Sequence, residues 1–379
     1  MIYLDNNATT RPAPEVIDAM AACLARDWGN PSSSHAVGQD AKRVLGEARS
    51  AVAALLGAHP VEVVFTSGAT EANQWVLEGA SAALDGKPPL LLLSAIEHSA
   101  QLKAARRLAQ NGRARLELMP VDRDGRVDLA AAARLIAPGV RLVSLMAANN
   151  ETGVVQPVAE VAALAKAAGA LFHIDATQAI GKLPFDFAHC GADLVSLSAH
   201  KVHGPKGIGA LLVRKGLVWP ALLSGSQERA RRGGTENLPG IAGFGAAARL
   251  AAARLRADGE HLSLLRGRLE QGLQARLPVR VFGAGAARLP NTLSLRIGTL
   301  DADLVLARME QAGFIAASGS ACSAGGNEPS HVLTAMGIPP EEARGAIRLS
   351  LSRDNTIAEI DALLERLPGL LAAPLAEAA

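Results

Sequence analysis

The chain has 379 residues and a formal net charge of +2, with its charges interspersed, so it offers no basic surface for nucleic acid. Aromatic residues make up only 3%, which argues against base-stacking platforms, and no run of about 18 apolar residues predicts a membrane-spanning helix. Its three scattered cysteines fit a reducing cytoplasm better than a disulfide framework or a metal site. With no secretory signal at the start, we expect a cytoplasmic protein without a membrane, nucleic-acid or metal partner.

Short apolar runs alternate with alanine-rich helical stretches through the middle of the chain. Runs that are apolar on both faces and separated by helices indicate a mainly parallel sheet covered on both sides. We therefore predict the α/β class with a seven-stranded sheet. The predicted strands are Val61–Phe65, Leu90–Ser94, Leu116–Pro120, Leu142–Met146, Leu171–Asp175, Leu194–Leu197 and Ile208–Val213. The predicted helices include Ala69–Leu84, Ser99–Gln110, Leu129–Ile136 and Val158–Ala168.

The remainder predicts a smaller α+β unit that begins within a long helical stretch, Leu238–Leu277. We expect a large domain over residues 14–255 and a small domain formed by residues 1–13 and 256–379. Fraying is expected over the last eight residues, 372–379. The predicted elements of the small domain are strands at Val279–Phe282, Asn291–Ile297 and Ala346–Leu351 and a helix at Asp301–Ala312.

A carboxylate and a lysine, Asp175 and Lys201, lie at or after the ends of predicted strands. Asp175 closes the run 170–174, and Lys201 follows 26 positions later in Ser-Ala-His-Lys. A pyridoxal-phosphate (PLP) enzyme needs a lysine to form a Schiff base with the cofactor and a buried carboxylate to keep the pyridine nitrogen protonated. Alone the pair is weak evidence, because buried strands often end in Asp and most lysines are solvated.

A small-residue turn, Ser67-Gly68-Ala69-Thr70, follows the first predicted strand and precedes a helix. Free N–H groups and the positive end of a helix favour a phosphate at such a turn. An ordinary capping box with Ser67 or Thr70 as N-cap is the alternative interpretation. The matching position of Asp175 and Lys201 after strand ends favours the phosphate interpretation.

Polar residues follow other predicted strands as well. His98 is either a packing or capping residue, or an imidazole that lies against a cofactor ring and exchanges protons. Asn150 belongs to an Asn-Asn-Glu-Thr-Gly turn, and Gln178 lies one helical turn beyond Asp175. Their common position predicts that they meet at one edge of the sheet.

Cys322 lies in a polar, glycine-bearing loop without apolar periodicity, whereas Cys23 lies in an apolar run. A cysteine on such a loop is free to react, so we interpret Cys322 as a nucleophile and Cys23 and Cys190 as packing residues. Arg348 interrupts an apolar strand and therefore needs an anion, which is either an internal carboxylate or a bound ligand. Arg353, a few residues later, is interpreted as a surface group.

From Tyr3 to about Asp361 the chain resembles the cysteine desulfurases, which are fold-type-I PLP enzymes of the class V aminotransferase type. The resemblance is specific because many motifs occur in the same order. They are Tyr3-Leu4-Asp5-Asn6-Asn7-Ala8-Thr9-Thr10, Gly29-Asn30-Pro31-Ser32-Ser33-Ser34-His35, Thr66-Ser67-Gly68-Ala69-Thr70-Glu71, Glu97-His98, Asn149-Asn150-Glu151-Thr152-Gly153, His173-Ile174-Asp175-Ala176-Thr177-Gln178, Ser198-Ala199-His200-Lys201 and Ser318-Gly319-Ser320-Ala321-Cys322-Ser323.

The resemblance implies a role for each matching residue. Lys201 would bind PLP covalently and move the α-proton, while Asp175 would pair with the pyridine nitrogen. Gln178 would face the phenolic oxygen, and His98 would stack on the ring and exchange protons with the substrate. Asn150 would touch the cofactor, and together with Arg348 it would hold the substrate carboxylate. The phosphate would be bound by Ala69, Thr70, Ser198 and His200, and by Thr235 from a second subunit of a homodimer.

The implied reaction removes sulfur from L-cysteine, leaving L-alanine and a persulfide on Cys322. A sulfur-acceptor protein would then take the sulfur: an iron–sulfur scaffold, a transfer-RNA thiolation enzyme or another carrier. Relatives that serve the scaffold commonly have a longer C-terminal tail, and many have Gly where Ser352 stands. The alternatives are a selenocysteine lyase, a class V aminotransferase, or a scaffold protein with this fold and no turnover. A transaminase would not need Cys322 and typically has an aromatic residue at the position of His98.

Overall fold

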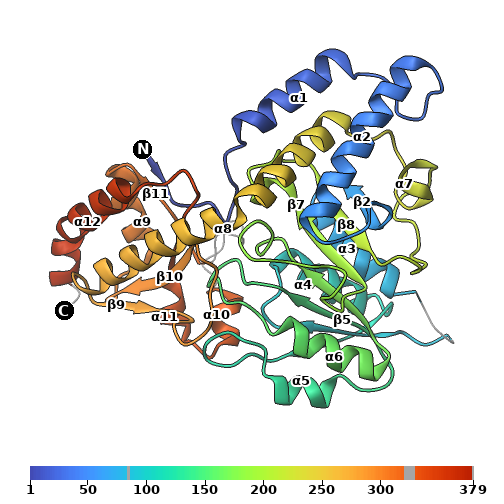
Figure 1. The fold of residues 1–379 in the computed structure, drawn as a ribbon. Coiled ribbons are helices and arrows are strands. Elements are labelled where there is room, and N and C mark those ends of the chain that lie inside the picture. The colour runs from blue at the N-terminus through green and yellow to red at the C-terminus, as the bar shows by residue number, and fades with distance from the viewer. Residues whose placement is uncertain (83–85, 320–328, 378–379) are drawn as a thin grey trace.

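The computed structural model describes residues 1–82, 86–319 and 329–377, and its largest feature is a seven-stranded sheet (Figure 1). The strands lie in the order β2-β8-β7-β6-β5-β3-β4. The predicted α/β class and number of strands are confirmed. The bounds of the strands are Val63–Thr66 for β2, Leu90–Ser94 for β3, Arg115–Met119 for β4, Val140–Met146 for β5, Leu171–Asp175 for β6, Leu194–Ser198 for β7 and Gly209–Val213 for β8.

The sheet is mainly parallel, as predicted. The pairs β3–β4, β3–β5, β5–β6 and β6–β7 are parallel, so their carboxyl ends meet at one edge. Strand β8 is antiparallel to both of its neighbours, which the sequence did not predict. Residues 199–208 alone connect β7 to β8, which is too short for the crossover that a parallel pair needs. The chain therefore turns back at the carboxyl edge.

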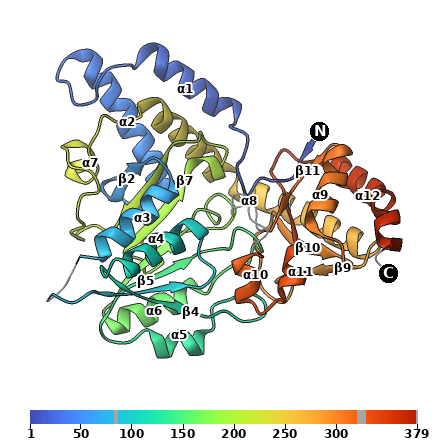
Figure 2. The same cartoon turned by 180° about the vertical axis from the view of Figure 1, so that it is seen from behind.

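Helices cover both faces of the sheet (Figures 1 and 2). Successive residues of a buried strand point to opposite faces, so Val63 and Phe65 pack in one core and Val64 packs in another. The helices packed with Val64 are α3 (Ala69–Ala80) and α4 (Ser99–Gln110), and those of the opposite core include α1 (Pro14–Arg26), α2 (Ala36–Leu55), α6 (Val158–Ala168) and the first half of α8 (Leu238–Gln274). Helix α5 spans Leu129–Leu135.

A smaller part of the molecule is built on an antiparallel four-stranded sheet in the order β12-β13-β10-β9. A two-stranded parallel pair of β1 and β11 joins the start of the chain to it. The bounds are Ile2–Tyr3 for β1, Val279–Val281 for β9, Thr292–Ile297 for β10, Phe314–Ile315 for β11, Ala317–Ser318 for β12 and Ile347–Ser350 for β13, with helices α9 (Ala302–Gln311), α10 (His331–Ala335), α11 (Pro340–Arg344) and α12 (Ile357–Glu377).

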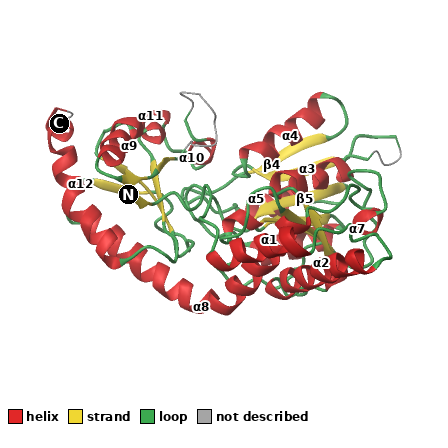
Figure 3. Cartoon of the chain, turned by 90° about the horizontal axis from the view of Figure 1, so that it is seen from above, coloured by secondary structure: helices red, strands yellow, loops and turns green. Residues whose placement is uncertain are grey.

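Helix α8 joins the two parts, as the view in Figure 3 shows. Its first half contributes Ile241 to the core of the large sheet, and its second half contributes Leu265 and Leu269 to a separate core. The predicted domain boundary between residues 255 and 256 falls inside this helix and stays a prediction. No helix in the described part of the chain has the length and apolar character needed to span a membrane.

The first residues of the chain are also held between the two parts. Asn7 N donates a hydrogen bond to Ser350 Oγ at 2.9 Å. Asn7 Nδ2 donates to Thr292 Oγ1 at 2.9 Å and to the Asn150 carbonyl at 3.1 Å. Asn7 and Ser350 are 343 positions apart in the sequence, so local sequence patterns do not reveal the contacts that fix this segment.

Two predictions near the C-terminus are wrong. Fraying was predicted for residues 372–379, but α12 continues through Glu377, because Leu371 is fully buried and Leu375 packs on the same core. Residues 378 and 379 lie outside the described residues, so the prediction is untested for them. Arg353 was interpreted as a surface group, but its side chain is only 10% exposed. Its Nη1 lies 3.8 Å from Asp258 Oδ2, so a carboxylate on α8 accounts for its burial.

Candidate active site

A cavity of about 570 Å³ lies at the carboxyl edge of the large sheet, where open α/β sheets bind ligands. It extends to β13 of the smaller part through Arg348, so both parts contribute to its wall. Most of the predicted site residues line it: Ala69, Thr70, His98, Asn150, Asp175, Gln178, Ser198, His200, Lys201 and Arg348. Cys322 lies outside the described residues, and Thr235 is exposed on a loop beyond the cavity.

Lys201 ends the short helical turn that follows β7. Its Nζ donates hydrogen bonds to the carbonyls of Asn7 and Ala8, the latter at 2.9 Å. Two backbone carbonyls of the N-terminal segment therefore hold the amine at the cavity wall. Asn7, Ala8 and Thr9 also line the cavity, although they were not predicted as site residues. Their place in a motif of the resembling family was the available signal.

Asp175 ends β6 and is 5% exposed. Its Oδ2 accepts a hydrogen bond from Asn73 Nδ2 at 2.7 Å, and its Oδ1 accepts one from Thr177 N at 3.0 Å. Both partners line the cavity, and neither was predicted. Asn73 Oδ1 and Thr177 Oγ1 are buried and have no hydrogen-bond partner among the described residues. Such atoms need a ligand or water to compensate for their burial, so the wall around Asp175 suits a polar molecule.

The start of α3 forms another part of the cavity wall. Gly68 is the N-cap, so neither Ser67 nor Thr70 takes that position. A Cβ added at Gly68 would lie 3.7 Å from Ser198 Oγ, in the gap that the absence of a side chain leaves. The first N–H groups of a helix have no partner within it and favour an anion. The turn from β2 into α3 therefore provides a cradle that fits a phosphate.

His200 and Lys206 line the cavity near this cradle. His200 Nδ1 lies 3.1 Å from Thr9 Oγ1. Burial, together with the charges of Lys201, Lys206 and Lys182, lowers the pKa of His200 to about 4. His200 is therefore neutral near pH 7, and its ring acts as a hydrogen-bonding group rather than a charge.

His98 is the N-cap of α4, and its Nδ1 accepts a hydrogen bond from Ala100 N at 3.3 Å. The capping interpretation is therefore right, and the ring lines the cavity as well. Burial lowers the pKa of His98, while the nearby Asp175 raises it and Lys201 lowers it. The ring is thus neutral at pH 7, and with Nδ1 accepting, the proton resides on Nε2. A neutral imidazole of this kind is suited to accept or return a proton.

Arg348 projects from β13 and is 2% exposed. Its Nη2 pairs with Asp5 Oδ1 at 2.6 Å, and its Nη1 donates to the Asn150 carbonyl at 3.0 Å. The internal ion pair considered for this arginine therefore exists. Arg348 nevertheless lines the cavity, and its Nε has no partner among the described residues. The guanidinium group is thereby fixed in orientation and has donor capacity for an anionic ligand.

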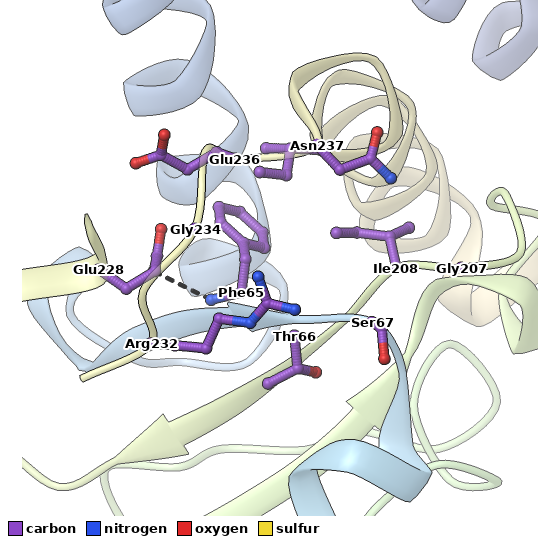
Figure 4. A pocket seen from close by; sticks show the side chains of 11 residues that line it. Phe65, Thr66, Ser67, Gly207, Ile208, Glu228, Arg232, Gly234, Glu236 and Asn237 are labelled. Carbon is purple, nitrogen blue, oxygen red and sulfur yellow. Dashed lines mark hydrogen bonds between the residues drawn. The ribbon is translucent and has the colours of Figure 1, made fainter. Parts of the chain in front are cut away.

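The loop that carries Thr235 is attached to β2 and α3, and Figure 4 shows the small pocket between this loop and the end of β2. Glu228 Oε2 accepts a hydrogen bond from Phe65 N at 3.0 Å, drawn as the dashed line. Glu228 also pairs with Arg49 at 2.7 Å, and Arg232 pairs with Glu71 of α3 at 3.0 Å. These contacts fix the base of the loop while Thr235 stays exposed.

The chain matches the family described as Aminotransferase class-V over residues 2–363. It is 48% identical over 373 residues to a cysteine desulfurase of Cereibacter sphaeroides, covering 98% of this chain and 95% of the relative. A cysteine desulfurase of Rhodobacter capsulatus is 47% identical, with 98% and 96% covered. A solved structure described as a NifS-like protein superposes with a TM-score of 0.92 at 36% identity, covering 98% of this chain and 99% of that one.

These relatives match nearly the whole chain in sequence and in fold, and the geometry of the cavity agrees with the resemblance found in the motifs. The chain belongs to the aminotransferase class-V family, and within it to the PLP-dependent cysteine desulfurases.

Proposed function

We propose that the cavity binds PLP and that the ten predicted residues on its wall act in the roles that the family resemblance implies. The observation that carries the proposal is that Lys201, Asp175 and His98 line one cavity together with the start of α3. A lysine, a carboxylate, an imidazole and an anion cradle are the groups that PLP chemistry requires. Bound there, PLP would supply an electron sink that makes the α-proton of an amino acid acidic.

Different residues around the cavity would bind different parts of the cofactor. Lys201 would hold it covalently through Nζ, and Asp175 would pair with its pyridine nitrogen. Gln178 would donate to its phenolic oxygen, and Asn150 would touch it as well. The phosphate would lie in the cradle of Ala69, Thr70, Ser198 and His200. Because Asn73 and Thr177 hold both oxygens of Asp175, that carboxylate is oriented before the cofactor arrives.

The substrate would be L-cysteine, with its carboxylate held by Arg348 and Asn150. Arg348 is already oriented by Asp5, which reduces the entropy lost when the carboxylate binds. Lys201 would take the α-proton, and His98 would exchange protons with the substrate from its neutral state. Each of these groups acts from the wall of one cavity, so the groups are held in place before the substrate binds.

Cys322 would receive the sulfur. Its thiolate would attack the sulfur of the substrate, forming an S–S bond as the Cβ–S bond breaks. The electron pair of the broken bond would remain on the substrate carbon, which takes up a proton and leaves as L-alanine. An acceptor protein, such as an iron–sulfur scaffold or a transfer-RNA thiolation enzyme, would then take the outer sulfur from the persulfide in the cytoplasm.

The proposal includes a homodimer, in which Thr235 of one subunit reaches the phosphate of the other. The exposure of Thr235 and the firm attachment of its loop support this role. Sedimentation and activity measured across a dilution series would test it. We expect activity to be lost together with the dimer, and a fully active monomer would exclude the shared site.

The central experiment compares the parent protein with the Lys201→Ala variant and with Lys42→Ala, which changes an exposed lysine on α2. Each protein is loaded with PLP, and its visible spectrum and its production of alanine and sulfide from L-cysteine are measured. The Lys201→Ala variant should lose the Schiff-base band and at least about 100-fold in rate, or roughly 2.7 kcal/mol. Lys42→Ala should resemble the parent. An unchanged band without Lys201 would overturn the assignment.

A further inference from the structure

Lys182 is a buried lysine that has no role in the proposed reaction described above. It lies in the turn that leaves Asp175, four residues beyond Gln178, and is 9% exposed. Among the described residues no carboxylate lies within 4.0 Å of its Nζ. The hydrogen bonds of Nζ go to Gln178. An unpaired buried ammonium group destabilises a fold, so such a group is a candidate for a functional role.

The contacts of Lys182 determine how the Gln178 amide is oriented. Lys182 Nζ lies 3.1 Å from the Gln178 carbonyl and 3.4 Å from Gln178 Oε1. An ammonium group has donors and no acceptor, so the side-chain oxygen of Gln178 must face it. The amide nitrogen is thereby turned the other way, where Gln178 Nε2 donates to the Asn7 carbonyl at 3.0 Å. That carbonyl also accepts a hydrogen bond from Lys201 Nζ.

Lys182 and Lys201 share the wall of a second, small cavity of about 30 Å³ beside the main one. The other ionisable groups on this wall are His203, Asp258 and Arg353. Asp258 is engaged with Arg254 at 3.0 Å and with Arg353 at 3.8 Å, so its charge is already matched. Burial, together with the nearby charge of Lys201, lowers the pKa of Lys182 to about 7. Both forms of the amine retain N–H donors for Gln178.

We propose that Lys182 is a positioning residue that fixes the Gln178 amide with its nitrogen toward the main cavity. The proposal rests on the proposed function, in which that nitrogen donates to the phenolic oxygen of the cofactor. Without Lys182, the amide could turn over and present its oxygen to the phenolic oxygen, where two acceptors would repel each other. Lys182 would thus act on the reaction through Gln178 and never touch the substrate.

The test is an absorbance titration with pH of the PLP-loaded protein, which reports the protonation of the linkage to Lys201. Loss of a donor leaves the phenolic oxygen more basic and stabilises the protonated linkage. The midpoint should therefore rise by about one pH unit in Lys182→Met. Lys182→Gln removes the charge but retains a donor, so its midpoint should rise by less. Equal rises in the two variants, or no rise in Lys182→Met, would overturn the proposal.

Combining Lys182→Met with Gln178→Met tests whether Lys182 acts through Gln178 or through a general effect of its charge. In Gln178→Met the midpoint should already be raised, and adding Lys182→Met should raise it little further. Fully additive shifts would contradict the proposal. Should Lys182→Met fail to fold, Lys182→Gln in the two backgrounds gives the same comparison. Lys166→Met on α6, where the lysine is exposed, is the matched control and should titrate like the parent.

The affinity of the apoprotein for PLP gives a readout independent of turnover, and it should weaken several-fold in Lys182→Met. The Lys201→Ala variant distinguishes a failure of the proposed function from a failure of the proposed role of Lys182. If that variant retains the pH-dependent band, the proposed function itself fails. If it loses the band while Lys182→Met titrates and binds PLP like the parent, only the role of Lys182 fails.

Discussion

Asn73 Nδ2 donates a hydrogen bond of 2.7 Å to Asp175 Oδ2, and so links the helix that begins the phosphate cradle to the carboxylate at the end of β6. Asn73 is 4% exposed, and its amide is held on α3, which starts at the cradle. One helix therefore sets both the phosphate end and the carboxylate end of the cavity. A hydrogen bond between two buried side chains thus ties the carboxylate to the helix that begins the cradle.

We expect Asn73→Ala to lower kcat about 10-fold or more, because hydrogen bonds to charged groups contribute roughly 1.5–3 kcal/mol. Asp175 would remain but would lose its orientation, so PLP content should fall less than turnover. Steady-state kinetics gives kcat, and the absorbance of the PLP-loaded protein gives its PLP content. The exposed Asn111→Ala at the end of α4 is the control and should leave kcat unchanged. Equal losses of PLP content and kcat would indicate a cofactor-binding role instead.

Arg348→Lys should raise the KM for L-cysteine at least about 10-fold, with a smaller change in kcat. A lysine keeps the charge, but it cannot pair with Asp5, donate to the Asn150 carbonyl and still present a fixed donor to a carboxylate. Arg353→Lys is the matched control, because that arginine pairs with Asp258 at 3.8 Å and does not line the main cavity. A KM that is unchanged in Arg348→Lys would remove this residue from substrate binding.

Cys322→Ser should abolish alanine formation while PLP still binds and the spectrum still changes on addition of L-cysteine. Serine is a far poorer nucleophile toward sulfur. Burial raises the pKa of both Cys23 and Cys190, so neither offers much thiolate near pH 7, and their alanine variants should stay largely active. Mass spectrometry after brief exposure to L-cysteine should find one added sulfur on the Cys322 peptide. Added sulfur on Cys23 or Cys190 would contradict this assignment.

Glu151→Gln should make the protein more stable near pH 7 but not near pH 4. Glu151 is 3% exposed, and its burial raises its pKa to about 7, despite a hydrogen bond from Ser330 and the charge of Arg348. A raised folded-state pKa favours the fold fully below the unfolded value of 4.5, and that advantage is lost as pH rises to about 7. The full shift corresponds to on the order of 3 kcal/mol.

Chemical denaturation of the parent and of Glu151→Gln at a series of pH values would measure this effect. The difference between the two proteins should grow from pH 4.5 to pH 7 and then level off. Glu160→Gln changes an exposed carboxylate on α6 and should show no such trend. A difference independent of pH would show that folding does not raise the pKa of Glu151. Because Glu151 contacts Ser330 and lies 3.7 Å from where a Cβ on Gly319 would stand, activity should be measured alongside stability.

The strands and much of the site could be predicted because their signals are local. The strand Leu171–Asp175 and the helix Ser99–Gln110 have the predicted bounds. Apolar runs that end in polar residues identify carboxyl strand ends, and parallel pairing brings those ends together whatever the strand order. Asp175 and Lys201 could thus be placed in one site without knowing that β6 and β7 are neighbours.

The partners of those residues could not be predicted in the same way. Asn73 lies in the middle of a helix, and its orientation toward Asp175 depends on how α3 packs on the sheet. Asn7 meets Lys201 only because β13 and the smaller sheet hold the N-terminal segment in place. The reversal of β8 and the burial of Arg353 likewise depend on contacts between distant segments, which no periodicity encodes.

The anchoring of Asn7 by Ser350 has a consequence for the order of events during synthesis. The seven strands of the large sheet end at Val213, so that sheet can assemble while the rest of the chain is still being made. The carbonyls that hold Lys201 belong to the first residues of the chain, yet their position depends on a strand near its end. Acquisition of the cofactor in its final geometry is therefore expected to follow the synthesis and pairing of β13.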